Sequence, residues 1–297
     1  MNINKKKAIL FLTGGIGNQF YQYCALEKIT EELNLNPIID LNNFNNKWQY
    51  REVGIFKLLK AFNYEKEVNV SSKFYRPFIP KFHKKFPELT NLIFNSILNR
   101  KIITNKKDYE ELFDNQRKYN LWITGYLQFH EMIADSKIGQ HLKFNYLRKS
   151  TSHKIGVHIR LGDYLEKPFS HVYWKFNEYY LEESLKLIKK TYGENFIKKV
   201  FLFSDSLKIA KNIITRVLPK DVEIVYSEGN SVLDDLVALS ECNIKILSNS
   251  TFSLLSYYLN SSEMTICPKK WYENVYETPR ELFPPDFYNG RFIKLDN

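Results

Sequence analysis

The second half of the sequence alternates short apolar runs with longer segments in which apolar residues recur at helical spacing. Expected strands cover residues 155–160, 199–203, 222–226, 244–247 and 264–267, and expected helices cover residues 177–190, 233–242 and 251–259, with a further helix ending near residue 218. Strands joined by helices pair in parallel, because a parallel connection has to cross over the sheet. This half is therefore expected to form a doubly wound parallel α/β sheet.

The first of these strands ends in the stretch KIGVHIRLGDY, residues 154–164. Strand-compatible residues run into Arg160, and Gly162 and Asp163 then supply a turn signal. Open α/β sheets bind ligands at the carboxyl ends of their strands, and a guanidinium group presents a fork of donors that fits phosphate. Arg160 is therefore a candidate phosphate ligand. The alternative is an Arg160–Asp163 ion pair that only stabilises the turn.

Polar residues also follow two other strands of this half. Asp205 follows residues 199–203, and the segment SNST, residues 248–251, opens the helix after residues 244–247. In a parallel sheet these positions share one edge with Arg160. A helix start rich in hydroxyl groups can bind an anion, although simple helix capping explains the serines and threonine as well. The convergence predicts a nucleoside diphosphate site, with Asp205 accepting from the base or ribose. The expected phosphate ligands are Arg160, Asn249, Ser250 and Thr251.

The N-terminal part is typical of a strand, a glycine loop and a helix, over residues 8–13, 14–17 and 18–34. Such a loop exposes backbone N–H groups at the positive end of a helix, which makes Gly15 a candidate nucleotide contact. The sequence GGIGNQ matches neither the GxGxxG fingerprint nor a Walker loop. A tight turn that requires glycine sterically is the alternative explanation. A strand over residues 37–40 would complete a βαβ unit.

The remainder of the first half is less regular. Residues 42–120 mix aromatics, lysines and prolines and indicate only short helices, and variable regions of this kind often shape a substrate site. A strand over residues 121–127 and a helix over 129–135 follow. The polar segment 140–151 is expected to connect two domains. We therefore expect an α/β protein with domains at residues 1–150 and 151–297.

The bulk properties narrow the function classes. The net charge of +10 suits nucleic acid, an anionic membrane surface or a phosphorylated substrate, and a solvated surface is slightly favoured over any one of them. No recognisable nucleic-acid-binding motif accompanies the charge. The 3 cysteines are widely spaced, which favours buried thiols of the cytosol over disulfides or a zinc site. The apolar runs are too short for a membrane span, and no signal peptide is evident. We expect a cytoplasmic protein.

Short motifs occur in order along most of the chain. They are GGIGNQFYQYC at residues 14–24, IIDLNNF at 38–44, GYLQ at 125–128, HIRLGDY at 158–164, FSDS at 203–206, and DLVALSEC at 235–242 followed by SNSTFS at 248–253. This set resembles the motifs of the bacterial α-1,2-fucosyltransferases of glycosyltransferase family 11.

The resemblance implies a GT-B-type enzyme with two Rossmann-like domains and a nucleotide site at the strand ends of the C-terminal domain. It implies inverting transfer of L-fucose from GDP-β-L-fucose to the 2-hydroxyl of a galactoside, in the synthesis of a surface glycan such as an O-antigen or capsule. Arg160 would neutralise the leaving diphosphate, a role that a metal often takes, and His158 belongs to the same nucleotide-binding motif. The chain has no DxD motif, so we expect no metal and no cofactor besides the donor substrate.

An inverting displacement needs a group that takes the proton of the acceptor hydroxyl. Asp163 and Asp40 are the candidates for this base, although a turn-stabilising role suits Asp163 as well. Asn18 is expected to orient the acceptor or the phosphate through its amide. Gln128 and His171 are further candidates on the acceptor side, although a lone histidine is more often structural.

Three positions depart from the family's motifs. Leu161 stands in place of a second arginine, residues 244–245 replace a histidine-containing pair, and residues 254–255 replace a pair of tryptophans. These changes leave open another GDP-deoxyhexose donor or a non-galactose acceptor. An inactive GDP-binding module and a basic nucleic-acid-binding protein are further alternatives, although we expect no nucleic-acid partner. Lysine clusters such as residues 81–85 suggest peripheral contact with an anionic inner membrane, where a lipid-linked acceptor would lie.

Overall fold

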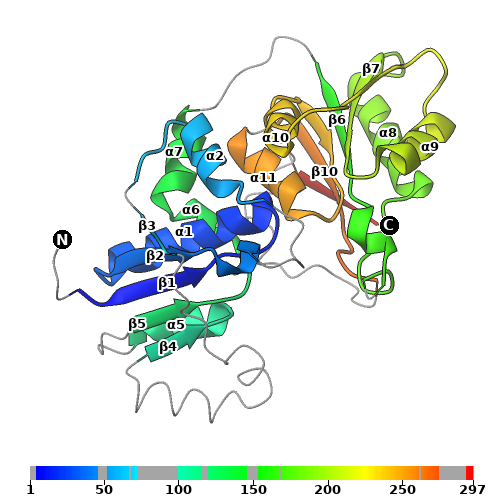
Figure 1. The fold of residues 1–297 in the computed structure, drawn as a ribbon. Helices are drawn as coiled ribbons and strands as arrows, with labels where there is room; N and C mark the ends of the chain where they lie inside the picture. Colours follow the sequence, from blue (N-terminus) through cyan, green and yellow to red (C-terminus); the bar gives the residue numbers. More distant parts are fainter. Residues whose placement is uncertain are drawn as a thin grey trace. The chain divides into compact units, whose positions relative to one another are not determined.

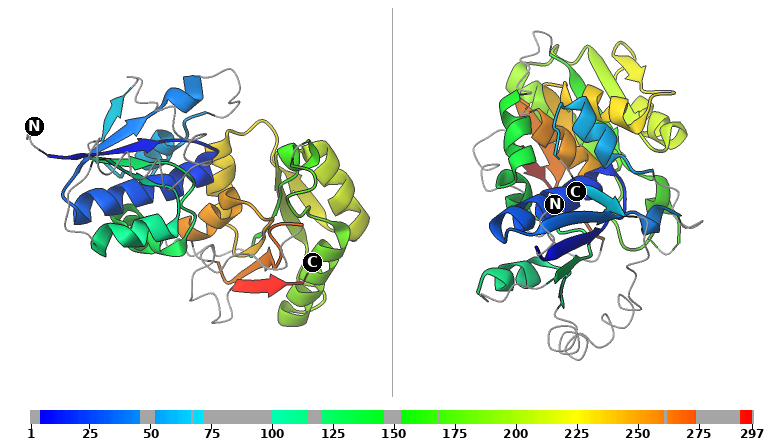
Figure 2. Two further views of the ribbon diagram at one scale, coloured as in Figure 1. Left: turned by 90° about the horizontal axis from the view of Figure 1, so that it is seen from below. Right: turned by 60° about the vertical axis from the view of Figure 1, so that its left-hand side comes forward.

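The computed structural model describes residues 5–45, 52–66, 68–71, 100–114, 120–145, 153–167, 169–260, 262–273 and 292–296. The chain divides into two compact units, Met1–His141 and Leu142–Asn297. Each unit contains one parallel β-sheet with helices packed against it (Figures 1 and 2). The predicted α/β class with two Rossmann-like sheets is confirmed.

The C-terminal unit has a sheet with the strand order β11-β10-β9-β6-β7-β8. Its strands are β6 (Ile155–Ile159), β7 (Lys199–Ser204), β8 (Glu223–Tyr226), β9 (Ile244–Ile246), β10 (Met264–Pro268) and β11 (Phe292–Leu295). All of these neighbours pair in parallel. Because β7 and β8 extend from one side of β6, and β9 to β11 from the other, the order reverses between β6 and β9. This reversal is the topological switch point at which doubly wound sheets bind ligands.

Helices cover both faces of this sheet. They are α8 (Glu178–Tyr192), α9 (Leu207–Val217), α10 (Val232–Ser240) and α11 (Thr251–Leu259). Figure 1 shows α8 and α9 on one side and α10 and α11 on the other. The alternation along β6 explains the division: Val157 and Ile159 join the core cluster with α8 and α9, whereas Gly156 and His158 face α10 and α11. A Cβ atom on Gly156 would lie 2.7 Å from the Cys242 sulfur, so only glycine allows this packing.

The N-terminal unit has a sheet with the strand order β3-β2-β1-β5-β4, again all parallel. Its strands are β1 (Lys7–Phe11), β2 (Asn36–Asp40), β3 (Asn69–Ser71), β4 (Arg100–Ile103) and β5 (Asn120–Ile123). Its helices are α1 (Ile16–Glu32), η1 (Asn42–Asn45), α2 (Ile55–Ala61), α5 (Lys106–Asp114) and α6 (His130–Ala134), and α7 (Lys137–Asn145) begins in this unit and extends past its last residue, His141. The order reverses between β1 and β5, so this unit has a switch point of its own.

The sequence predicted most of these elements, but it missed the strands β3, β4 and β11 and misplaced two boundaries. The segment 140–151 was expected to be a connection, but α7 extends to Asn145, because Ile138 and Leu142 lie one turn apart and are both buried. The strand expected over residues 121–127 ends at Ile123, because Gly125 and Leu127 take positive φ angles that end the strand. Within the described residues, no helix has both the length and the apolar character needed to cross a membrane.

Candidate functional site

The carboxyl ends of β6, β7 and β9 bring three predicted residues together in the C-terminal unit. Arg160 follows β6, Asp205 follows β7, and Ser248 follows β9. The Ser248 hydroxyl accepts a hydrogen bond from the backbone N–H of Arg160 at 3.2 Å and lies 2.9 Å from Nδ1 of His158. These contacts bridge β6 and β9 at the switch point. Arg160 therefore stands where this class of sheet places its ligand.

The Arg160 guanidinium contacts two carboxylates. Its Nη1 atom lies 2.5 Å from Oδ2 of Asp205, and its Nη2 atom lies 2.6 Å from Oδ1 of Asp163. The central carbon of the guanidinium, Cζ, lies over the Tyr164 ring, 5.4 Å from the ring centroid. The side chain is 18% exposed, so the cation is held at the edge of the sheet without being sealed from solvent. The ion pair with Asp163 that the sequence offered as an alternative is present, and it coexists with an accessible guanidinium.

Asp205 is bound on both of its carboxylate oxygens. Oδ1 accepts the backbone N–H groups of Leu161 at 3.0 Å and Gly162 at 3.2 Å, while Oδ2 pairs with Arg160. The sequence suggested that Asp205 accepts from a base or ribose. In the structure this carboxylate fixes the loop after β6 and the guanidinium together, and its contact with a base or ribose stays a prediction.

Substitution of Gly162 tests this packing. A Cβ atom at this position would lie 2.3 Å from Oδ2 of Asp205, which Arg160 already holds. We expect Gly162→Ala to lower the free energy of unfolding by about 1–3 kcal/mol through overpacking, as measured by chemical denaturation. Leu165→Ala, at an exposed position of the 3-10 helix η2 (Gly162–Leu165), is the control and should have a much smaller effect. Equal stabilities of the two variants would contradict the close contact.

His158 is buried and does not present its ring to solvent. Its Nδ1 atom lies 2.9 Å from the Ser248 hydroxyl and 2.5 Å from the Ser253 hydroxyl, and its ring packs against Phe252. Burial, aided by the positive charge of Arg160, lowers the pKa of His158 to about 3, so the ring is neutral near pH 7. The residue expected to contact the nucleotide thus supports Ser248, which in turn holds the backbone of Arg160.

The SNST segment is shaped by its own side chains. The Asn249 amide is buried and donates to the carbonyls of Trp174 at 2.9 Å and Trp271 at 2.8 Å, while its backbone carbonyl accepts from the Tyr164 hydroxyl. Ser250 is the N-cap of α11 and accepts from the backbone N–H of Phe252. The capping alternative therefore holds for Ser250. Thr251 is the first residue of α11, where backbone N–H groups gather at the carboxyl end of β9.

The glycine loop of the N-terminal unit is held by two glutamines that the sequence analysis did not single out. The buried Gln19 amide donates to the carbonyl of Gly14 at 2.8 Å and also bonds to the backbone of residues 52–55. Gln22 donates to and accepts from the backbone of Thr13. Both are fully buried. Gly15 is the N-cap of α1, so the loop conformation is fixed next to a helix N-terminus.

At the switch point of this unit, the loop after β5 meets the glycine loop. The side-chain amide of Gln128 donates a hydrogen bond to the side-chain oxygen Oδ1 of Asn18 at 2.6 Å. A Cβ atom on Gly14, whose φ is +80°, would lie 3.0 Å from the Tyr126 ring. Tyr126 is 45% exposed while Leu127, with φ +46°, is buried. The left-handed backbone thus turns one side chain inward and leaves the aromatic ring exposed beside the two amides.

The other predicted residues lie in different surroundings. Asp40 is buried, and its two oxygens accept the backbone N–H and the side-chain amide of Asn42 at 2.8 and 3.0 Å. It therefore stabilises a turn. His171 is exposed and belongs to the C-terminal unit, in the segment between β6 and α8. Asn18, Gln128 and Asp40 belong to the N-terminal unit.

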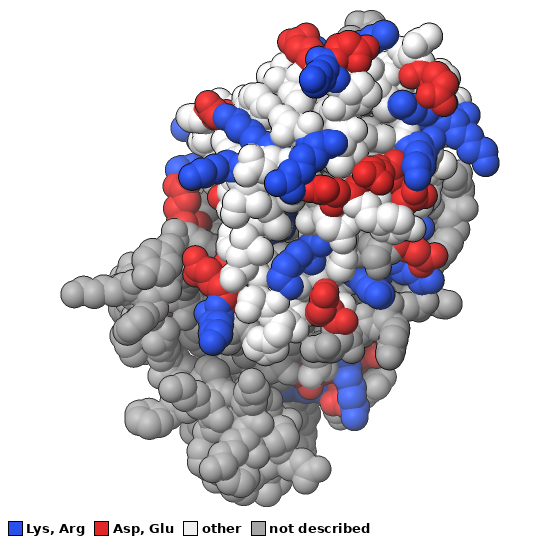
Figure 3. Space-filling view, turned by 90° about the vertical axis from the view of Figure 1, so that its right-hand side faces the viewer, with Lys and Arg blue, Asp and Glu red and all other residues white. Residues whose placement is uncertain are grey.

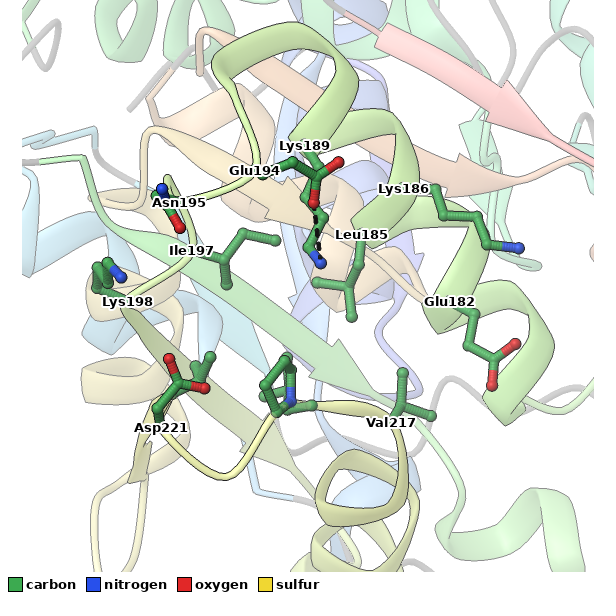
Figure 4. A pocket seen from close by; sticks show the side chains of 13 residues that line it. Glu182, Leu185, Lys186, Lys189, Glu194, Asn195, Ile197, Lys198, Val217 and Asp221 are labelled. Carbon is green, nitrogen blue, oxygen red and sulfur yellow. Dashed lines mark ion pairs between the residues drawn. The ribbon is translucent and has the colours of Figure 1, made fainter.

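A hollow at the opposite end of the C-terminal unit is separate from this edge. It is lined by α8 and by the segments that lead into the amino ends of β7 and β8, with an ion pair between Lys189 and Glu194 at 3.4 Å (Figure 4). Ligands of doubly wound sheets bind at the carboxyl ends of the strands, so this hollow is not part of the candidate site. Within the described part of the chain, no group of three or more His, Cys, Asp or Glu residues is arranged to hold a metal ion.

Comparison with protein families decides the classification. Residues 38–288 match the family described as glycosyl transferase family 11. The chain belongs to this family. It is a glycosyltransferase, and its two Rossmann-like units give it the predicted GT-B-type fold. Arg160, Asp205 and the SNST segment all lie within the residues that match the family.

Two curated relatives come from Escherichia coli. The chain is 25% identical over 279 residues to an alpha-1,2-colitosyltransferase, with 88% of this chain and 91% of that protein covered. It is 26% identical over 297 residues to the O-antigen biosynthesis glycosyltransferase WbnK, with coverage of 88% and 93%. Among solved structures, fucosyltransferase NodZ from Bradyrhizobium is similar, with 15% identity, a TM-score of 0.48, and coverage of 88% of this chain and 96% of that one.

Proposed function

We propose that this enzyme transfers L-fucose, or a deoxyhexose close to it, from a GDP-sugar to the 2-hydroxyl of a galactoside in O-antigen or related lipopolysaccharide synthesis. The observation that carries the proposal is the Arg160 guanidinium at the switch point between β6 and β9, held by fixed partners. The names of the two E. coli relatives support the same sugar class and pathway.

In this proposal the C-terminal unit binds the donor. Arg160 stabilises the negative charge that develops on the leaving diphosphate, while Ser248 and Asp205 keep it in place. A cation that is already oriented by its neighbours pays little reorganisation cost when the sugar–phosphate bond breaks. Arg160 thus supplies the charge stabilisation that a metal supplies in other transferases, and the reaction proceeds with inversion.

The N-terminal unit is proposed to bind the acceptor, through Asn18, Gln128 and Tyr126. Of the two candidate bases, Asp163 suits proton transfer better, because its side chain is 37% exposed whereas both oxygens of the buried Asp40 are bound by Asn42. The hydrogen of the acceptor hydroxyl would pass to the Asp163 carboxylate as the oxygen attacks the anomeric carbon.

Substitution of Tyr126 tests the acceptor assignment. An exposed aromatic ring beside two amides can stack on the apolar face of a sugar while the amides bond its hydroxyls. We expect Tyr126→Ala to raise the acceptor KM by roughly tenfold, the effect of losing about 1.4 kcal/mol of binding, and to leave donor affinity unchanged. The exposed Tyr179 of α8 provides the control variant, Tyr179→Ala. An unchanged acceptor KM in Tyr126→Ala would rule out this role.

The donor is the main open choice within the sugar class. Colitose lacks the 3-hydroxyl of fucose, so the two donors differ by one hydrogen-bonding group. A site built to bond that hydroxyl rejects the deoxy analogue by ~10⁴-fold or more, whereas an apolar pocket discriminates by only ~10²-fold. The ratio of the kcat/KM values for GDP-fucose and GDP-colitose therefore shows whether the donor site hydrogen-bonds the 3-hydroxyl or surrounds that position with apolar groups.

The deciding experiment measures GDP release with EDTA present, from GDP-fucose and GDP-colitose, across lactose, N-acetyllactosamine and galactosyl-β-1,3-N-acetylgalactosamine. Acceptor-dependent release with either donor, and an α-1,2 linkage in the product, would support the proposal. GDP binding without release on any acceptor would favour the inactive binding module. Absence of GDP binding would refute the nucleotide site itself.

Peripheral membrane contact remains a proposal for the same enzyme, placing it in the cytoplasm at the inner membrane with a lipid-linked acceptor. Its motivation is the lysine-rich first half of the sequence, although residues 81–85 lie outside the described residues. On the face in Figure 3, basic and acidic side chains are interspersed, so this face offers no large surface of one sign. Flotation with anionic vesicles at low salt should carry the protein upward, and failure to float would exclude the contact.

A further inference from the structure

The two carboxylates that hold Arg160 differ in their position and in their exposure to solvent. Asp205 has three bonds, because it accepts two backbone N–H groups with one oxygen and pairs with Nη1 through the other. Asp163 meets the guanidinium at Nη2 from the 3-10 helix η2 (Gly162–Leu165), and its side chain is more exposed, at 37% against 27%. One partner of Arg160 is therefore anchored by the loop backbone, and the other lies at the solvent side.

The charges of this triad do not suit a diphosphate as they stand. One guanidinium faces two carboxylates, so Arg160, Asp163 and Asp205 together carry a net negative charge. A diphosphate adds further negative charge within a few ångströms, where like charges repel. Phosphate oxygens also seek the guanidinium N–H groups that the carboxylates occupy. A guanidinium has five N–H groups, so their number does not force an exchange, but the added negative charge favours the release of one carboxylate from Arg160.

We infer that Asp163 is an exchangeable partner of Arg160 that the donor's diphosphate displaces, while Asp205 is the positioning residue that keeps the guanidinium aimed. This inference rests on the proposed function and deepens it. The exchange breaks the Asp163–Nη2 ion pair and forms a phosphate–Nη2 contact in its place. The carboxylate released from Arg160 is then available to accept the hydrogen of the acceptor hydroxyl. Donor binding would thus precede productive acceptor binding.

The exchange gives the two aspartates effects of opposite sign on nucleotide binding. Asp163→Asn removes a competing charge, so GDP should bind more tightly, by roughly fivefold for a partly exposed pair. Asp205→Asn loosens the anchored partner and should weaken GDP binding by about tenfold or more. In Asp163→Asn the turnover number should fall although GDP binds better, because the released side chain can no longer take the proton.

The test is calorimetric titration of the full-length protein with GDP at one fixed ionic strength, for wild type and the two variants. Glu166→Gln is the matched control, because it removes one negative charge at the end of the same 3-10 helix from a side chain that makes no ion pair with Arg160 among the described contacts. It should change GDP affinity much less than Asp163→Asn does. Asp163→Ala, measured in parallel with the thermal stability of each variant, guards against a folding defect.

The outcomes separate this inference from the proposed function. No GDP binding by the wild-type protein would refute the proposed nucleotide site. GDP binding by wild type, together with equal or weaker binding by folded Asp163→Asn and Asp163→Ala, would overturn the exchange and leave the proposed function standing. Tighter binding by Glu166→Gln of the same size would also overturn it, because the effect would then be one of general charge.

Discussion

Arg160→Ala is expected to lower the rate of sugar transfer by ~10²–10³-fold or more while the protein remains folded. The loss is that of a preorganised charged donor aimed at charge that develops in the transition state. The substitution also leaves Asp163 and Asp205 facing the leaving diphosphate without the cation that neutralises them. Both effects raise the barrier of the same step. The measurement is kcat/KM for GDP release with the best acceptor found for the wild type.

A conservative variant separates charge from geometry at this position. Arg160→Lys keeps the positive charge but cannot span the two carboxylates, which the guanidinium meets through different nitrogens. We expect it to recover only part of the lost activity. Circular dichroism and thermal denaturation should show both variants folded, since the strand core beneath Arg160 is made by Val157 and Ile159. Turnover by folded Arg160→Ala within a few-fold of wild type would contradict the role assigned to Arg160.

The location of Arg160 and its ion pair with Asp163 could be anticipated from sequence, whereas its other bonds could not. Strand periodicity and the parallel pairing rule place residues after β6, β7 and β9 on one edge whatever their side chains do. The bonds of Asp205 to Leu161 and Gly162 link segments 43 and 44 residues apart. No local pattern encodes such contacts, so the anchoring role of Asp205 is visible only in the structure. The same holds for the burial of His158, whose two serine partners lie 90 and 95 residues away.

The N-terminal unit was harder to predict for a different physical reason. Gln19 lies in a helix whose residues are buried almost all round, so its role depends on the backbone of residues 52–55 and not on any amphipathic pattern. Tyr126 is positioned by two positive φ angles in one short loop. Gly125 can be recognised in the sequence as a residue that adopts a positive φ angle, but nothing in the sequence marks Leu127 as one. Residues 125–127 of the GYLQ motif were expected to continue a strand, and the structure shows instead a loop in which Tyr126 is exposed.

A departure from the family's motifs, Lys245, has its own consequence for stability. It lies on β9, is fully buried, and donates to the carbonyl of Asn260 at 2.8 Å. Asn260 is the C-cap of α11, and the negative end of a helix partly compensates a buried cation. Burial nevertheless dominates and lowers the pKa of Lys245 from 10.5 to about 7. The family's histidine-containing pair is thus replaced by a lysine that loses its proton far more easily than usual.

Lys245→Met is expected to stabilise the protein near and below pH 7 and to change the pH dependence of its stability. Between pH 7 and about 10, the unfolded chain keeps the lysine proton while the folded protein has released it. Folding therefore becomes more favourable as the pH rises, by up to ~1.4 kcal/mol per pH unit from this group.

Methionine has no such proton, so wild-type stability should rise relative to the variant across this range. Below pH 7 both the folded and the unfolded wild type are protonated at Lys245, so the difference should level off with the variant more stable. Loss of the hydrogen bond to the Asn260 carbonyl offsets about 1 kcal/mol of that advantage. Urea denaturation from pH 6 to 9, with the exposed Lys208→Met as control, measures this directly. Parallel pH profiles for wild type and Lys245→Met would show that the buried amine stays protonated, and would locate the compensation in the helix end at Asn260.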